Sequence, residues 1–222
     1  MWLAYAMNGV VWNEDGTLNE ESVMEALKYM ETLVKEELVA PEDKTSSGMD
    51  AYKRLTGGSA SFLTGPTSFV SRSTNEEECS VVGQIAPILM PGKEAKSEVT
   101  MALPEGLGVT KFSENKEAAK KFVEWYTSAD MQKELNASNS AIPTRNSVLK
   151  SLVEDGTIKN AGAMMDEAER IVSPFPNGIP AYYAEMSSAM YNAINKMALG
   201  EMTAEEAFED MNAKITELVE QE

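Results

Sequence analysis

The sequence predicts an α/β fold that is predominantly helical. Apolar residues recur at three- and four-residue spacing over most of the 222 residues, which is typical of amphipathic helices. Only short apolar runs bounded by Gly or Pro have the length of strands. With 43% of its residues hydrophobic, the chain can bury a sizeable core, as one large domain or two small ones. We expect about seven or eight helices and about four or five short strands.

The first long helix is predicted from a capping box. Thr17 is followed three residues later by Glu20, and apolar residues then recur at helical spacing as far as about Val39. A shorter helix over 49–56 is expected to end at a glycine pair.

The predicted strands are short and lie in the middle of the chain. The runs over 60–64 and 81–89 have the length and the Gly or Pro boundaries of strands, and two further extended pieces are expected within 99–110.

Helices dominate the rest of the chain. They are expected over 113–126, over 128–135, from about 146, over 160–172 and over 181–199. Thr203 and Glu206 form a second capping box, which starts the last helix. Its apolar stripe consists of Ala207, Met211, Ile215 and Leu218.

Composition excludes several classes of function. A net charge of −17 repels phosphate backbones and anionic lipid, so we expect no nucleic-acid partner and no membrane-surface partner. The chain has no histidine, which removes histidine-based triads, histidine general bases and histidine-ligated zinc. It also lacks a phosphate-binding loop and a calcium-loop spacing. We therefore expect no cofactor and no metal site. Cys79 is the one cysteine, so no intrachain disulfide is possible.

No segment approaches the ~18 consecutive apolar residues that cross a bilayer. The opening residues have no basic region before their apolar stretch, which Asn8 and Gly9 interrupt, so they do not read as a signal peptide. We expect this opening to correspond to the interior of a longer chain, with the export signal outside it.

Several stretches, taken in order, resemble one known family. They are "ASFLTGPTSF" at 60–69, "GLGVTKFSENKEAAKKFVEWYTSADMQKEL" at 106–135, "IPTRNSV" at 142–148 and "PAYYAEMSSAMYNAINKMALGEMTAEEAFEDMNAKI" at 180–215. The ordered set is similar to the latter half of extracellular solute-binding proteins of sugar-type ABC importers, the group that includes maltose-binding protein. The resemblance implies a partial periplasmic-binding-protein-like (type II) fold that lacks most of the N-terminal lobe.

The resemblance also implies an organisation into lobes. Residues 1–84 and 136–222 would form the two parts of the C-terminal lobe, and 85–135 would return to the N-terminal lobe. If the elements that cover 85–135 are absent, apolar residues such as Phe122 and Val123 should be exposed, and such patches favour self-association.

The Gly-Pro turn after 60–64 is the first candidate ligand site that the family suggests. A Gly-Pro turn lets the backbone come close to a sugar and fixes the side chains that follow. Pro66 would lie at this approach, Thr67 and Ser68 would exchange hydrogen bonds with hydroxyls, and Phe69 would offer an apolar ring. The family's usual tryptophan after Gly-Pro is replaced here by Thr67.

The resemblance implies further ligand contacts from Trp2, Glu105, Gly106, Arg145, Tyr182 and Tyr183. A buried tryptophan is an equal alternative for Trp2, a loop glycine is nearly as good for Gly106, and a surface salt bridge is the commoner role for Arg145. Adjacent helical positions point ~100° apart, so at most one of the two tyrosines faces the ligand.

The function implied is binding without chemistry. The protein would take a sugar or oligosaccharide into a cleft, close by hinge motion, and dock on the membrane permease of an ABC importer. Its parent would be extracytoplasmic, in the periplasm or as a cell-surface lipoprotein. This chain alone would bind solute weakly or not at all. Two alternatives stay open: a glycosidase, which needs two carboxylates ~5–10 Å apart, and a helical interaction module with no ligand.

Overall fold

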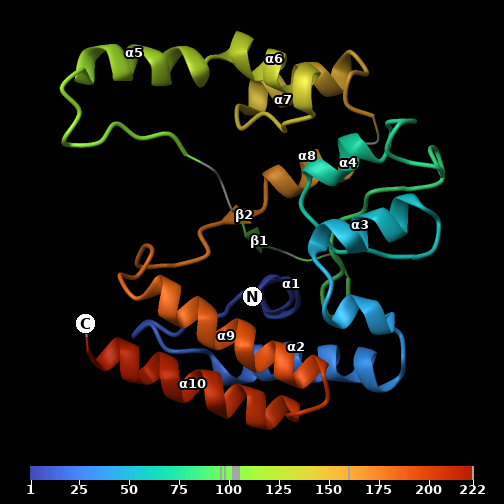
Figure 1. Ribbon diagram of the computed structural model, residues 1–222, viewed down its shortest axis with the longest axis vertical. Coiled ribbons are helices and arrows are strands. Elements are labelled where there is room, and N and C mark those ends of the chain that lie inside the picture. Colours follow the sequence, from blue (N-terminus) through green and yellow to red (C-terminus); the bar gives the residue numbers. More distant parts are fainter. Residues whose placement is uncertain (96, 98, 102–105, 160, 222) are drawn as a thin grey trace. The chain divides into compact units, whose positions relative to one another are not determined.

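The computed structural model describes residues 1–95, 97, 99–101, 106–159 and 161–221. The chain forms two compact units. Unit 1 comprises Met1–Ala51, Leu89–Ala102 and Arg170–Glu222, and unit 2 comprises Tyr52–Ile88 and Leu103–Glu169. Both units are built mainly from helices, as predicted (Figure 1).

Unit 1 has one hydrophobic core that draws on both ends of the chain. Its elements are α1 (Trp2–Asn8), α2 (Glu20–Lys35), η1 (Pro41–Lys44), β1 (Thr100–Met101), β2 (Ile171–Val172), α9 (Tyr183–Ala198) and α10 (Ala204–Glu220). Helices α9 and α10 lie side by side as an antiparallel hairpin, and both pack against α2 (Figure 1). The predicted stripe of α10 is confirmed, because Ala207, Met211, Ile215 and Leu218 are all buried in this core.

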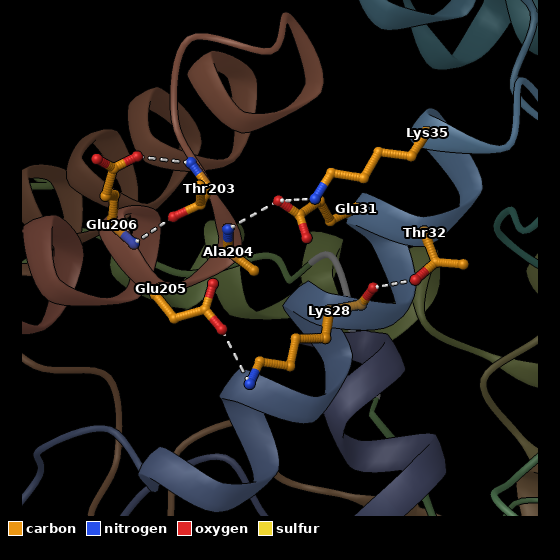
Figure 2. Close-up of polar contacts among 8 residues, drawn as sticks. All are labelled: Lys28, Glu31, Thr32, Lys35, Thr203, Ala204, Glu205 and Glu206. Atoms are coloured by element: carbon orange, nitrogen blue, oxygen red, sulfur yellow. Dashed lines mark hydrogen bonds and ion pairs between the residues drawn. The ribbon is translucent and has the colours of Figure 1, made fainter.

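The start of α10 has the predicted capping box. The Thr203 Oγ1 atom accepts a hydrogen bond from the backbone N–H of Glu206 at 3.2 Å. The Glu206 carboxylate accepts in return from the backbone N–H of Thr203 at 2.8 Å (Figure 2). Two N–H groups that the helix itself leaves unpaired are thereby satisfied.

Helix α2 adds two contacts to the same helix start. The Glu31 carboxylate accepts a hydrogen bond from the backbone N–H of Ala204 at 3.3 Å, and it pairs with Lys35 at 2.9 Å. Lys28 pairs with Glu205 at 2.9 Å (Figure 2). A carboxylate is favourable at this place, because the first turn of a helix carries partial positive charge.

A two-stranded parallel sheet joins distant parts of unit 1. Thr100 pairs with Ile171, and Met101 pairs with Val172. The Thr100 N–H donates to the Arg170 carbonyl at 3.0 Å, and the Arg170 guanidinium donates to the Ser97 carbonyl at 3.1 Å. These bonds tie the segment before β1 to the segment that enters β2.

A three-residue polar contact holds the 89–101 segment to the rest of unit 1. Lys93 Nζ lies 2.7 Å from the Glu25 carboxylate, which also accepts from the Asn8 side-chain amide at 2.9 Å. These hydrogen bonds lower the pKa of Glu25, with Lys93 as the larger cause, and the same contact raises the pKa of Lys93.

Unit 2 has a smaller core and longer irregular segments. Its helices are α3 (Gly48–Thr56, of which the first turn belongs to unit 1), α4 (Ser68–Arg72), α5 (Lys116–Tyr126), α6 (Ala129–Asn139), α7 (Asn146–Glu154) and α8 (Gly162–Ala168). The core consists of Val148, Leu149, Leu152, Ile158, Ala161 and Met164, all from α7, α8 and the connection between them.

The strands predicted over 60–64 and 81–89 are wrong. Among the described residues the strands are β1 and β2 alone, and the runs over 60–64 and 81–89 are irregular. Burial explains the difference for 60–64, because a strand needs a neighbour and a covered face, whereas Phe62 is 87% exposed. Of the pieces expected within 99–110, β1 is present, 106–110 is irregular, and 102–105 lie outside the described residues.

The first capping box is also wrong. The Thr17 hydroxyl donates to the Asp15 carboxylate at 2.6 Å, so this residue closes a turn. Asn19 caps α2 instead and accepts from the Ser22 N–H at 3.1 Å. The helix ends at Lys35 rather than near Val39.

Most other helix boundaries agree with the predictions. Helix α3 ends at Thr56 before the glycine pair, Ser128 caps α6, and α7 begins at Asn146. The helix expected over 160–172 is shorter, because β2 takes its last residues. Helix α1 was not predicted.

Candidate functional site

The Gly-Pro turn in unit 2 leads directly into α4. The Phe69 N–H donates to the Pro66 carbonyl at 3.0 Å, and the Val70 N–H donates to the Thr67 carbonyl at 3.0 Å. A Cβ atom on Gly65 would lie 2.8 Å from the Phe69 ring. Glycine is therefore required at position 65, because the backbone there lies against the Phe69 ring. The ring that approaches the backbone is thus that of Phe69 and not that of a sugar.

Phe69 also packs against Tyr52. Their ring centroids are 4.3 Å apart at an interplanar angle of 32°. Tyr52 is buried, and its hydroxyl has no hydrogen-bond partner among the described residues. Burial, with the nearby charge of Glu78 as the next cause, raises the pKa of Tyr52 to about 12. Phe69 is thus half-buried between Gly65 and Tyr52, and part of its surface already serves the packing of unit 2.

The hydroxyl pair remains accessible beside this turn. Thr67 and Ser68 are half-buried, and Pro66 is exposed. The turn therefore offers two hydroxyl groups and one exposed proline ring at the surface of unit 2.

Arg145 and Gly106 are the other two predicted ligand residues of unit 2 that the structure describes. The Arg145 Nε atom donates to the Thr127 carbonyl at 2.8 Å, and its backbone N–H donates to the Gln132 side chain at 3.1 Å. This contact ties the start of α7 to the end of α5. Gly106 is exposed, and a Cβ atom there would meet nothing within 4 Å. Glu105 lies outside the described residues.

Trp2 begins α1 in unit 1. Its side chain is half-buried, and its indole N–H is buried without a hydrogen-bond partner among the described residues. A buried indole N–H usually finds a partner. Trp2 therefore has unused hydrogen-bonding capacity on a partly covered ring.

The two tyrosines at the start of α9 differ in their surroundings. Tyr182 is half-buried and packs against the core of unit 1, and its hydroxyl lies near Gly16. Tyr183 is 43% exposed and stands edge-on to Phe175, with ring centroids 5.7 Å apart at 89°. Tyr183 is the better candidate of the pair for contact with a ligand.

A cluster of aromatic rings that the sequence analysis did not single out supports Tyr183. Phe175 lies between Tyr183 and Trp12, and the Trp12 and Phe175 centroids are 5.5 Å apart. The Tyr5 hydroxyl and the Trp12 indole N–H both donate to the Pro174 carbonyl, each at 2.9 Å. The available signal was the aromatic residue within "SPFPNGIP" directly before α9. Phe175 thus supports the Tyr183 ring from one direction, while the side chain of Tyr183 stays 43% exposed.

Each unit also has a surface hollow away from these residues. The hollow on unit 1 is lined by Ala184, Glu185, Ser188, Ala189, Asn192 and Lys214. The hollow on unit 2 is lined by residues 113–118 at the start of α5. No candidate ligand residue is among either set.

The described residues contain no cluster of cysteine and acidic side chains that could hold a metal ion. None of the described helices combines the length and the apolarity that crossing a membrane takes. The candidate residues provide aromatic faces in unit 1 and hydroxyl groups in unit 2.

A model of the family described as bacterial extracellular solute-binding protein matches residues 2–133, more than half of the chain. This chain belongs to that family. Helices α1 to α5 and the Gly-Pro turn all fall within the matched range.

Solved structures confirm the fold. Maltose-bound MalE3 of T. maritima is 23% identical, with a TM-score of 0.77, over 98% of this chain and 56% of that one. The sugar-binding protein MalE of Xanthomonas citri is 16% identical, with a TM-score of 0.77, over 99% and 55%. An ABC substrate-binding protein of Listeria monocytogenes in complex with cycloalternan is 19% identical, with a TM-score of 0.73, over 97% and 55%. The chain thus spans little more than half the length of these proteins, and its fold is a partial one.

Proposed function

We propose that this chain is part of a substrate-binding protein of an ABC importer and that its solute is a sugar or oligosaccharide. The observation that carries the sugar class is the open, supported ring of Tyr183. An aromatic face suits the apolar C–H side of a sugar ring, and a rigid ring loses little entropy on binding. The solved neighbours whose titles name maltose or cycloalternan support the same class.

The hydroxyls of Thr67 and Ser68 in unit 2 would bind hydroxyl groups of the solute, which we expect to lie in a two-lobe cleft. Small hydroxyl side chains can both donate and accept, which matches sugar hydroxyls. Residues 1–84 and 136–222 would belong to one lobe and 85–135 to the other, and closure of the lobes would enclose the solute. The closed protein would deliver it to a membrane permease from an extracytoplasmic position, which is where the family's description places its members.

Saturation-transfer NMR with this chain against glucose, maltose and longer malto-oligosaccharides tests the proposal. Because part of the cleft belongs to the other lobe, we expect only weak binding, in the millimolar range or above, since each missing hydrogen bond removes ~0.5–1.5 kcal/mol. Tyr183→Ala should abolish the transfer. Tyr191→Ala is the matched control, because that ring is on the same helix, is 74% exposed and stands outside the ring cluster.

Transfer that survives Tyr183→Ala unchanged would contradict the assignment of this ring. Absence of transfer from every sugar, together with transfer from an amino acid or peptide panel, would contradict the sugar class. Aryl glycosides in the same samples test the enzymatic alternative, since release of the aryl group would mark a glycosidase.

A further inference from the structure

The sequence contains two Asn-Gly pairs, and both lie in unit 1. Asn8 is the last residue of α1 and Gly9 follows it, whereas Asn177 and Gly178 lie in the turn before α9. Glycine has no side chain to keep its backbone nitrogen away from the side-chain carbonyl carbon of the asparagine before it. Attack of that nitrogen on that carbon is a reaction of the chain with itself. Because the two pairs share this chemistry, any difference in rate comes from the contacts that hold each pair.

The first pair is held firmly on both sides of its peptide bond. The Gly9 N–H donates to the Tyr5 carbonyl at 2.8 Å and closes the last turn of α1, whose Tyr5 is buried in the core. The Asn8 side-chain amide donates to the Glu25 carboxylate at 2.9 Å. That carboxylate also binds Lys93 at 2.7 Å. A hydrogen bond to an ionised group is stronger than one between neutral groups.

The second pair is held by two longer hydrogen bonds between neutral groups. The Gly178 N–H donates to the Phe175 carbonyl at 3.2 Å, and the Asn177 side-chain amide donates to the Glu14 carbonyl at 3.2 Å. Both distances are at the long end of the range for N–H···O bonds. The Phe175 carbonyl also accepts from the Ser173 hydroxyl at 2.9 Å. This carbonyl therefore keeps a partner when the Gly178 N–H turns away, which lowers the cost of that movement.

The two pairs therefore differ in what must open before the reaction. Asn8 reacts only after a charge-assisted bond breaks and the last turn of a core helix unwinds. Asn177 needs only the two long bonds of its turn to break. Free energies of local opening range from near zero in loops to the full free energy of unfolding in core elements. The reactive geometry is therefore reached far more often at Asn177.

We propose that Asn177 is a modification site, at which the folded chain deamidates to aspartate and isoaspartate. The Gly178 nitrogen gives its proton to hydroxide and bonds to Asn177 Cγ. The Cγ–Nδ2 bond then breaks, and the side-chain nitrogen takes up a proton and leaves as ammonia. The product is a succinimide ring. Water adds to either ring carbonyl, the bond from that carbon to the Gly178 nitrogen breaks, and the nitrogen regains a proton.

The products lose one contact within unit 1. A carboxylate accepts hydrogen bonds but has no N–H to donate, so it cannot bond to the Glu14 carbonyl as the Asn177 amide does. Isoaspartate also adds a methylene group to the backbone between Phe175 and Tyr183. Deamidation therefore releases the segment that leads into α9 from the turn that contains Glu14.

Incubation of the chain at mildly alkaline pH, followed by peptide mapping with mass spectrometry, tests the proposal. Both pairs are measured in one sample, so Asn8 is the matched control for Asn177. In the folded chain deamidation at Asn177 should be at least about tenfold faster than at Asn8, since opening costs less in a turn than in a core helix. In urea, which removes the hydrogen bonds of both pairs, the two rates should become similar.

Asn177→Gln assigns the product to this site, because its longer side chain would have to close a six-membered ring. The variant should give no product at position 177 and an unchanged rate at Asn8, with circular dichroism showing that it is folded. Equal rates at the two pairs in the folded chain would overturn the proposal. So would folding that slows Asn177 as strongly as it slows Asn8, or a folded chain in which Asn177 gives no product.

Discussion

Helices α10 and α5 have similar amphipathic sequences and opposite surroundings. Six residues of α10 are buried, and its stripe fills the core of unit 1 against α2 and α9. No described residue of α5 is buried, although its apolar side includes two large rings. The pattern of a sequence therefore specifies which side of a helix seeks cover, but it does not specify what covers it.

The first turns of α10 and α5 also differ, because only α10 has capping hydrogen bonds from side chains. Helix α10 has a reciprocal capping box and a carboxylate from α2 at its first residue. Helix α5 begins after Asn115, whose side chain makes no capping hydrogen bond. A well-capped, buried helix should contribute much more to the free energy of unfolding than an uncapped, exposed one, and substitutions can measure the difference.

The largest expected effect comes from the buried stripe. Ile215→Ala removes a fully buried side chain and should lower the free energy of unfolding of unit 1 by about 2–4 kcal/mol, through lost burial and a cavity. Phe122→Ala in α5 should change stability by less than about 0.5 kcal/mol in dilute samples. Urea titrations followed by circular dichroism compare the two. Equal losses of stability in the two variants would mean that the apolar side of α5 is covered within the monomer.

The second-largest difference in stability is expected between the residues that precede the two helices, Thr203 and Asn115. Thr203→Ala removes the side-chain half of the capping box and should lower stability by about 1 kcal/mol. Asn115→Ala at the start of α5 removes no capping bond and should be close to neutral. The same urea titrations apply, and a cost at Asn115 similar to that at Thr203 would contradict the contrast between the two helix starts.

The contact from α2 to α10 should have a smaller effect. Glu31→Gln keeps the shape of the side chain but removes the charge that faces the Ala204 N–H and Lys35. We expect a loss of about 0.5–1 kcal/mol. Glu117→Gln, which breaks the exposed pair with Lys120 in α5, is the control and should have almost no effect.

The smallest effect should appear as a dependence on pH. The hydrogen bond from Lys28 lowers the pKa of Glu205, so the folded state favours the ionised carboxylate. The stabilisation is present above the usual glutamate value of 4.5 and is lost as pH falls through the lowered pKa. Lys28→Met should therefore lower the melting temperature slightly at pH 7 and by less at pH 3. A difference as large at pH 3 as at pH 7 would show that packing of the lysine stem, rather than the ion pair, is responsible.

The sequence predicted α9 and α10 of unit 1 well because local and distant signals agree there. The Thr203 and Glu206 capping box, the stripe of α10 and the fold class are all as expected. The strand predictions over 60–64 and 81–89 failed because short apolar runs cannot show whether a neighbouring strand exists, and Phe62 in the first run is exposed. The Thr17 prediction failed because its hydroxyl has a competing local partner in Asp15.

The candidate site was accessible to sequence reasoning only in part. The Gly-Pro turn and the tyrosine pair at the start of α9 were identifiable, and Tyr183 is exposed as a ligand contact requires. The support that Phe175 and Trp12 give to Tyr183 could not be predicted from the sequence. It depends on a contact between residues more than 160 positions apart in the chain. The lobe assignments for 1–84, 85–135 and 136–222 stay predictions.

The core of unit 1 can form only late in synthesis, because it combines helices from both ends of the chain. Its core combines α1 and α2 with α9 and α10, so the apolar sides of the first two helices emerge from the ribosome long before their partners. At about 5–20 residues per second, that delay is on the order of ten seconds or more. Unit 2 lies between and can form in the meantime. Ribosome-bound chains in which Glu169 has just left the exit tunnel should therefore contain a protease-resistant unit 2 and a protease-sensitive α2, because α9 and α10 have not yet joined the core of unit 1.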